Sequence, residues 1–185
     1  SFYLSNWLFL RLLGVGSLIA FLSLWSQIHG LVGSEGILPV ATYLKQVREI
    51  LGTACYWMIP TLCWLSSSDA SLTAICVGGT ILSLCLIVGI APLPTLFFLW
   101  IFYLSLVVVG QVFFSFQWDS LLLETGFISL FVAPGKWWSW PSRQNPPCAI
   151  GRWLLWWLLF KLMFLSGMTK LLSGDLMWRT LAALD

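Results

Sequence analysis

Four charged residues lie within or beside long apolar stretches, where an ionisable group is well placed to do chemistry: Asp119, Glu124, Lys161 and Lys170. A charge at membrane depth costs roughly 2.5–3.5 kcal/mol on insertion scales, so each of them requires a partner or a function. Asp119 and Glu124 are five residues apart, which places them about 140° apart around a helix and on different faces. The spacing therefore gives little support to a paired-carboxylate site for acid–base catalysis.

Lys161 lies near the middle of the last apolar stretch, too far from either end for its ammonium group to reach the membrane surface. We therefore expect an internal partner, and we predict that this partner is Glu124. The pair has two interpretations. It is either a structural ion pair that fixes how two helices align, or a site where Lys161 or Glu124 faces a cavity and acts as a base.

Other kinds of catalytic or metal site find no support in the sequence. His29 is the only histidine, and no cluster of cysteines or carboxylates accompanies it, so no zinc site is predicted. The chain has no G-x-S-x-G motif of a serine hydrolase and no glycine-rich loop for phosphate. We expect no catalytic residues, no metal and no cofactor. The cysteines form no C-x-x-C pair, and no spacing selects disulfide partners among Cys55, Cys63 and Cys148.

The composition shows which solvent surrounds these charges. Of 185 residues, 59% are hydrophobic and 9% are charged, whereas a soluble domain has about 25% charged residues. The 13 tryptophans suit the membrane–water interface, where the ring is buried and the N–H group stays hydrogen-bonded. A net charge of +2 without a basic cluster excludes an electrostatic surface for nucleic acid. These values predict one domain, residues 1–185, that is an all-α polytopic bundle of transmembrane helices in membrane lipid.

A transmembrane helix needs about 20 apolar residues, and this length divides the chain into five predicted spans. The spans cover residues 7–28, 51–65, 72–91, 95–116 and 153–172. The second of them is short and broken by Pro60, so a tilted or kinked span is expected there. Residues 119–132 are predicted as a short or re-entrant helix, and a sixth full crossing is the alternative. Val40–Leu51 is predicted as a short amphipathic helix. Arg11 lies close enough to the end of the first span for its side chain to reach the membrane surface.

Charge also predicts the topology. Residues 134–152 form a linker with Lys136, Arg143 and Arg152 but no acidic residue, so the positive-inside rule places this linker in the cytosol. Five spans then place the N-terminus in the cytosol and Asp185 on the opposite side. Because the chain starts without methionine and ends at Asp185 with no stop-like tail, we expect it to be part of a longer protein.

Three runs of the sequence resemble one known family. They read G-L-V-G-S-E-G-I-L-P at Gly30–Pro39, G-Q-V-F-F-S-F-Q-W-D-S-L-L-L-E-T-G-F at Gly110–Phe127, and W-L-L-F-K-L-M-F-L-S-G-M-T-K-L-L-S-G-D-L-M-W-R-T-L-A-A-L-D at Trp157–Asp185. In their order and content these runs resemble the lipase maturation factor family. The motif residues that the resemblance marks as structural or functional are Gln117, Trp118, Asp119, Glu124, Thr125, Gly126, Lys161, Ser166, Gly167, Lys170, Gly174, Asp175, Trp178 and Arg179.

The resemblance implies a location and a function. Members of this family are multi-pass proteins of the endoplasmic reticulum membrane that assist the folding, assembly and export of secreted lipases such as lipoprotein lipase, and they carry a further domain outside the membrane. The chain is then expected to be a chaperone-like factor for a lipase client, without catalysis of its own. Bacterial relatives, which would lie in the inner membrane, have no assigned role. Lys161 stands where an arginine is frequent in the family, which keeps the charge but loses bidentate geometry. Asp175 and Arg179 have the i, i+4 spacing of a helical ion pair, worth about 0.3–0.5 kcal/mol.

Two other functions are kept as alternatives. The family has been compared with vitamin K-dependent carboxylase-like proteins, which suggests a membrane-embedded enzyme as the second choice. A polar, water-accessible pocket around Glu124 and Lys161 would favour that enzyme, whereas a dry and fully paired contact would favour a structural role. A transporter is the third choice, but internal repeats, which would support it, are not found.

Overall fold

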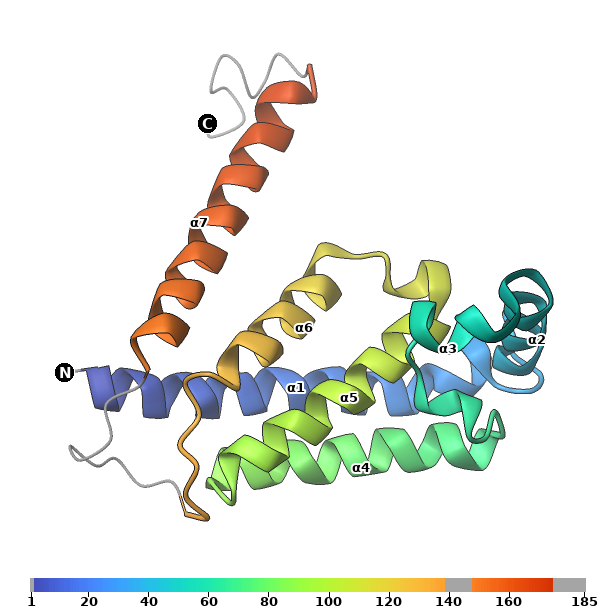
Figure 1. The fold of residues 1–185 in the computed structure, drawn as a ribbon, viewed down its shortest axis with the longest axis horizontal. Coiled ribbons are helices and arrows are strands. Elements are labelled where there is room, and N and C mark those ends of the chain that lie inside the picture. Colours follow the sequence, from blue (N-terminus) through green and yellow to red (C-terminus); the bar gives the residue numbers. More distant parts are fainter. Residues whose placement is uncertain (1, 139–147, 175–185) are drawn as a thin grey trace.

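A computed structural model describes residues 2–138 and 148–174, and these fold into helices with no β-strand (Figure 1). Four helices in this part of the chain are long and apolar enough to cross a membrane. They are α1 (Phe2–Val32), α4 (Asp69–Val88), α5 (Pro92–Val109) and α7 (Ala149–Leu172). The prediction of an all-α membrane bundle is therefore confirmed.

Local sequence sets the ends of the two central helices. The Ser68 hydroxyl accepts a hydrogen bond from the Ser71 N–H at 3.3 Å, which caps the start of α4. Gly89 then adopts a left-handed φ of 100°, which ends α4. Pro92 opens α5, since its fixed φ and missing N–H suit the first turn of a helix. The two helices are thus joined by a short turn and pack side by side.

The predicted span over residues 51–65 is wrong, because this segment is not one helix. It begins at the end of α2 (Val40–Leu51) and breaks into η1 (Gly52–Ala54), α3 (Cys55–Met58) and η2 (Leu62–Trp64). Gly52 has a φ of 55°, which ends α2, and Pro60 follows α3 and separates it from η2. The helix α2 itself has the bounds that its amphipathic pattern predicts.

Hydrogen bonds hold the whole segment between α1 and α4 at one end of the bundle. The Ser34 N–H and hydroxyl donate to the Asp69 carboxylate at 2.8 and 2.6 Å, so the end of α1 lies against the start of α4. The Leu62 N–H donates to the Ser105 hydroxyl at 3.1 Å, and the Thr61 hydroxyl donates to the Ser105 carbonyl at 3.0 Å. The chain therefore leaves α1 and enters α4 on the same side, with α2, α3 and η2 beside that end.

Close contacts between α1, α4 and α5 build the core. Phe21 of α1 is fully buried and makes an edge contact with Tyr103 of α5, with ring centroids 5.6 Å apart. The same ring lies so close to Gly79 of α4 that a Cβ atom there would stand 2.2 Å from it. Glycine at this position lets the helices approach one another, as small residues do in membrane bundles.

Arg11 contributes to the core and does not reach toward the membrane surface as predicted. Its side chain is 7% exposed, and its Nη1 donates to the Leu86 carbonyl in the last turn of α4 at 2.8 Å. The guanidinium also lies 5.1 Å from the centre of the Trp7 ring. A cation near the carbonyl end of a helix is favoured by the helix dipole, so Arg11 ties α1 to the end of α4.

The short helix predicted over residues 119–132 is α6 (Gln117–Ser129), which follows η3 (Gln111–Phe114). Thirteen residues give α6 a length of about 20 Å, less than the roughly 30 Å of a bilayer core. The indole N–H of Trp100 on α5 donates to the Leu123 carbonyl at 3.1 Å. A hydrogen bond to a carbonyl of α6 thus helps to hold this short helix against α5.

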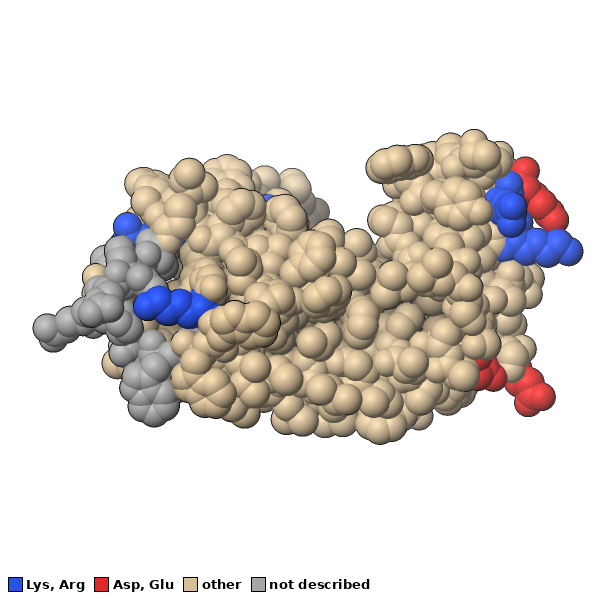
Figure 2. Space-filling view, turned by 60° about the horizontal axis from the view of Figure 1, so that its bottom comes forward, with Lys and Arg blue, Asp and Glu red and all other residues tan. Residues whose placement is uncertain are grey.

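The surface has the charge pattern of a membrane protein. On the face drawn in Figure 2, lysine and arginine side chains lie near both ends of the molecule, acidic side chains lie near one end, and a largely uncharged belt lies between the ends. Large apolar side chains are exposed on the long helices, including Ile19 at 64%, Phe98 at 50% and Phe164 at 53%. Exposed apolar side chains in such number suit lipid as the solvent.

The contact at Gly79 gives a first testable prediction. Gly79→Leu is expected to lower the melting temperature in detergent, with a loss of about 1–3 kcal/mol typical of an overpacked core, because the buried Phe21 ring cannot move aside. Gly30→Leu is the matched control, since a Cβ there has no neighbour within 4 Å. An equal loss of stability in the two variants would contradict the close contact.

Candidate functional site

The predicted pair of Glu124 and Lys161 is in contact in the structure. Glu124 lies in the second turn of α6 and Lys161 lies near the middle of α7. Both carboxylate oxygens of Glu124 are 2.5 Å from the Lys161 Nζ. The two side chains are 44% and 37% exposed, so the pair lies at the edge of the α6–α7 contact. Within the described residues, neither the ammonium nor the carboxylate has another side-chain hydrogen-bond partner.

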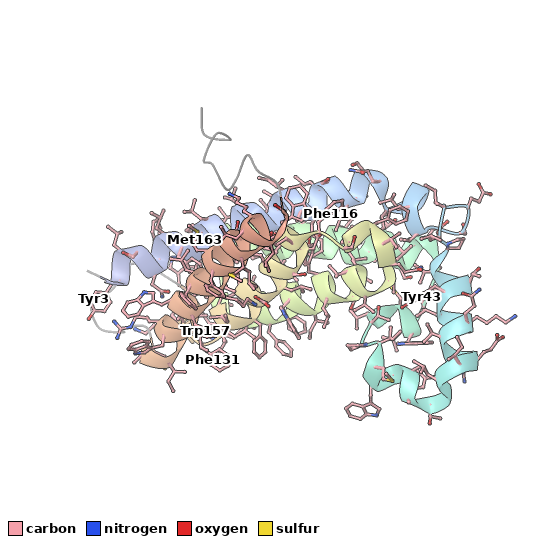
Figure 3. All side chains as sticks on the ribbon, turned by 90° about the horizontal axis from the view of Figure 1, so that it is seen from above. Tyr3, Tyr43, Phe116, Phe131, Trp157 and Met163 are labelled. Carbon is pink, nitrogen blue, oxygen red and sulfur yellow. The ribbon has the colours of Figure 1, made fainter. Side chains whose placement is uncertain are left out.

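The pair is one of the few contacts that hold α7 on the bundle. In Figure 1, α7 extends away from the other long helices, and only Gly151 and Leu158 are buried along its whole length. A Cβ on Gly151 would lie 2.5 Å from Val132, so the start of α7 meets the segment after α6. Figure 3 labels Trp157 and Met163 on α7, and these side chains are 62% and 67% exposed. The ion pair therefore has a large effect on where α7 lies.

Asp119 has a different partner from Glu124, as their spacing predicts. Its carboxylate accepts a hydrogen bond from the Tyr103 hydroxyl of α5 at 2.6 Å, and Asp119 and Tyr103 are 8% and 5% exposed. An acidic side chain in such a place is stabilised by the hydrogen bond that it accepts. The two acids of α6 thus link this helix to two different neighbours, α5 and α7.

The remaining motif residues of α6 have smaller contacts. Gln117 and Trp118 are exposed, and Trp118 makes an edge contact with the Phe116 ring. The Thr125 carbonyl accepts a hydrogen bond from Ser129, within the helix. A Cβ on Gly126 would lie 3.5 Å from the Trp100 ring, which is an ordinary packing distance.

The motif residues at the end of α7 are not brought to the ion pair. Ser166 is half-buried, and Gly167 has no neighbour within 4 Å of an added Cβ, so no close packing is found at this glycine among the residues described. Lys170 is exposed in the last turn, and Gly174 has a φ of 72° just after the helix ends. The predicted pair of Asp175 and Arg179, and the nearby Trp178, lie outside the described residues.

The structure shows no group of three metal-binding side chains within its described ranges. The His29 ring nitrogen Nε2 lies 2.9 Å from the Thr73 hydroxyl, which joins the ends of α1 and α4. All five cysteines are unpaired, Cys55 and Cys63 are buried, and Cys148 is exposed. Burial raises the pKa of the Cys63 thiol, which keeps this thiol protonated and unreactive near neutral pH.

Sequence reasoning missed Tyr103 and misplaced Arg11. Tyr103 lies in an apolar run where a tyrosine is ordinary, and only the alignment of α5 with α6 brings its hydroxyl to Asp119. The one signal that could have found it was the cost of an unpaired carboxyl at Asp119, which requires a donor on a neighbouring helix.

The sequence matches the family model described as the lipase maturation factor transmembrane domain over residues 4–185. The chain belongs to the lipase maturation factor family. It is 37% identical over 193 residues to lipase maturation factor 1 of Bos taurus, which covers 100% of this chain and 34% of that protein. It is 42% identical over 188 residues to lipase maturation factor 2 of Gallus gallus, which covers 96% of this chain and 26% of that protein. No solved structure matches.

As a lipase maturation factor family member, the chain is a multi-pass membrane protein, in agreement with its four long apolar helices. It spans about a third of the length of the bovine relative and about a quarter of the chicken relative. Its relatives are named as maturation factors and not as enzymes.

The ion pair gives a second prediction. Glu124→Lys and Lys161→Glu alone should each lower the melting temperature, because two like charges then meet, at a cost of roughly 2–3 kcal/mol if one must be neutralised at membrane depth. The double variant, with both charges exchanged, should recover most of that loss. A double variant no more stable than either single one would show that the two side chains are not partners.

Proposed function

We propose that this chain is the membrane-embedded part of a factor of the endoplasmic reticulum that assists the folding, maturation and secretion of lipases such as lipoprotein lipase. Family membership supports the proposal, and the relatives' names supply the lipase client. In this proposal the chain performs no catalysis of its own. Its charged residues hold helices in place, so that the parts of the protein outside the membrane are presented to the client in a fixed arrangement.

The geometry of Glu124 and Lys161 is the observation that carries the non-catalytic role. A catalytic base must have a lone pair that can reach a substrate. Here both oxygens of Glu124 contact the Lys161 Nζ, and each charge is satisfied by the other. The groove described in the next subsection is lined by Asp119 but by neither member of the pair. This arrangement favours a structural ion pair over the enzyme that was kept as the alternative.

A secretion assay tests the proposal. The full-length protein should restore secretion of active lipoprotein lipase from cells that lack their own maturation factor. Glu124→Gln and Lys161→Met should each reduce active lipase in the medium several-fold at unchanged protein abundance, because loss of either charge frees α7. The readout is lipase activity per amount of factor.

Lys45→Met provides the matched control, since Lys45 is an exposed lysine on α2 and has no part in the α6–α7 contact. This variant should secrete lipase as the wild type does. Failure of the wild-type protein to restore secretion would overturn the proposed function. Full activity of both charge variants would overturn the role given to the ion pair while leaving the family function in place.

A further inference from the structure

A long groove lies along one side of α1. The opposite wall is formed by Tyr103 of α5 and by side chains between Phe113 and Thr125, from η3 into α6. The α1 wall includes Leu13, Gly16, Ala20, Ser23, Gln27 and Leu31. These residues recur every three or four positions, so they form one face of the helix. From the first of them to the last, the wall is about 27 Å long. Phe116, labelled in Figure 3, lies where the yellow segment approaches α1 and lines the groove.

The shape of the groove fits a hydrocarbon chain better than a protein helix. Its cavity volume is about 540 Å³, and the space reaches about 1260 Å³ when the open mouth is counted. A helix with its side chains is 10–12 Å wide, so a helix of the same length would require roughly 2,000–3,000 Å³. An intact helix is therefore too large. Because the groove runs beside a membrane-spanning helix, lipid is the material that surrounds its mouth.

A buried carboxyl group gives the groove a hydrogen-bonding point. Asp119 is 8% exposed and lines the groove, and Tyr103 donates to one of its oxygens. Within the described residues no hydrogen bond to the second oxygen is found, and this oxygen is not among the fully buried atoms that lack a partner, so it keeps some exposure. A carboxylate oxygen can accept further hydrogen bonds, so the second oxygen of this groove-lining side chain is placed to accept one from a ligand.

Two polar residues of the α1 wall, Gln27 and Ser23, lie toward one end of the groove. Gln27 is five residues from the end of α1 at Val32, about 7–8 Å along the axis. Ser23 lies one turn further in, and its hydroxyl accepts a hydrogen bond from the Gln27 side chain at 3.2 Å. Toward Leu13 the α1 wall is apolar, with the open position Gly16. Asp119, whose partner Tyr103 contacts Phe21 of α1, lies between the polar end and the apolar end of this wall, so a lipid would place its head group at Asp119 and its chain toward Leu13.

We propose that this groove binds a neutral lipid with one acyl chain in the groove and a hydroxyl head group that donates to Asp119. A hydroxyl supplies a donor for the second oxygen of Asp119. An ionised carboxylate head, as in a fatty acid, has no donor to offer and is disfavoured beside an acidic residue. The proposal is independent of the lipase client, because it concerns the bundle alone.

Photolabelling of the full-length protein in phosphatidylcholine nanodiscs tests the proposal. The probe is a long-chain monoacylglycerol with a diazirine in its acyl chain, and the comparison probe is a fatty acid with the same chain. The monoacylglycerol should label the wild-type protein at least several-fold more than the fatty acid does. Mass spectrometry should place the adduct on the groove face of α1 or on residues 113–125.

Two variants separate the groove from the general lipid surface. Gly16→Phe should reduce monoacylglycerol labelling at least five-fold, because its ring fills a space in which an added Cβ has no neighbour within 4 Å. Gly30→Phe on the same helix is the control, since that position is equally open but does not line the groove. Asp119→Asn keeps the shape and an acceptor for Tyr103, and should abolish the preference for the hydroxyl head.

Melting temperatures near that of the wild type establish that the variants are folded. Equal labelling by the two probes would overturn the proposal, as would adducts spread over the outward faces of α4 and α7. Labelling of Gly16→Phe at the wild-type level would also overturn it. Loss of labelling in Gly16→Phe alone, with the preference for the hydroxyl head intact in Asp119→Asn, would overturn the role of Asp119.

Discussion

In lipid, a charged side chain must meet its partner inside the protein, and the contact between Glu124 and Lys161 meets that constraint for the last helix. Hydrophobic attraction does not hold α7 in place, since lipid is as apolar as the helix surface. Only Gly151 and Leu158 are buried along α7, and the ion pair adds a directional contact to this small interface. The position of α7 thus depends on two side chains of opposite charge as well as on the packing of Gly151 and Leu158.

The other helices are held by contacts of a different kind. Gly79 admits the Phe21 ring between α1 and α4, and Arg11 donates to a carbonyl at the end of α4. On α6, Asp119 binds Tyr103 while Glu124 binds α7, so this short helix connects the packed core to the protruding helix. The same Asp119 also lines the groove along α1. Positioning of helices and the proposed binding of lipid therefore involve neighbouring residues of one element.

The hydropathy pattern predicted the helical bundle and the amphipathic helix Val40–Leu51, and the free-energy cost of an unpaired charge in lipid predicted the partner of Lys161. They did not predict the parts of the fold that local backbone geometry determines. Residues 51–65 have the apolar composition of a span, but Gly52 and Pro60 break the helix, and hydropathy takes no account of such breaks. The contact of Tyr103 with Asp119 was beyond sequence reasoning, because it depends on how two helices align.

Disulfide cross-linking in native membranes tests the docking of α7 most directly. The protein for this test carries Val132→Cys and Gly151→Cys, with Cys148 replaced by serine. The two new thiols should lie close together, because an added Cβ on Gly151 would lie 2.5 Å from the Val132 side chain. Rapid cross-linking is expected, and it should slow when Lys161→Met is added. Replacing Gly151→Cys by Gly167→Cys, which lies about 24 Å further along α7, should prevent the cross-link to Val132→Cys. An unchanged rate in Lys161→Met, or equal cross-linking from Gly167→Cys, would contradict an α7 held on α6 by its ion pair.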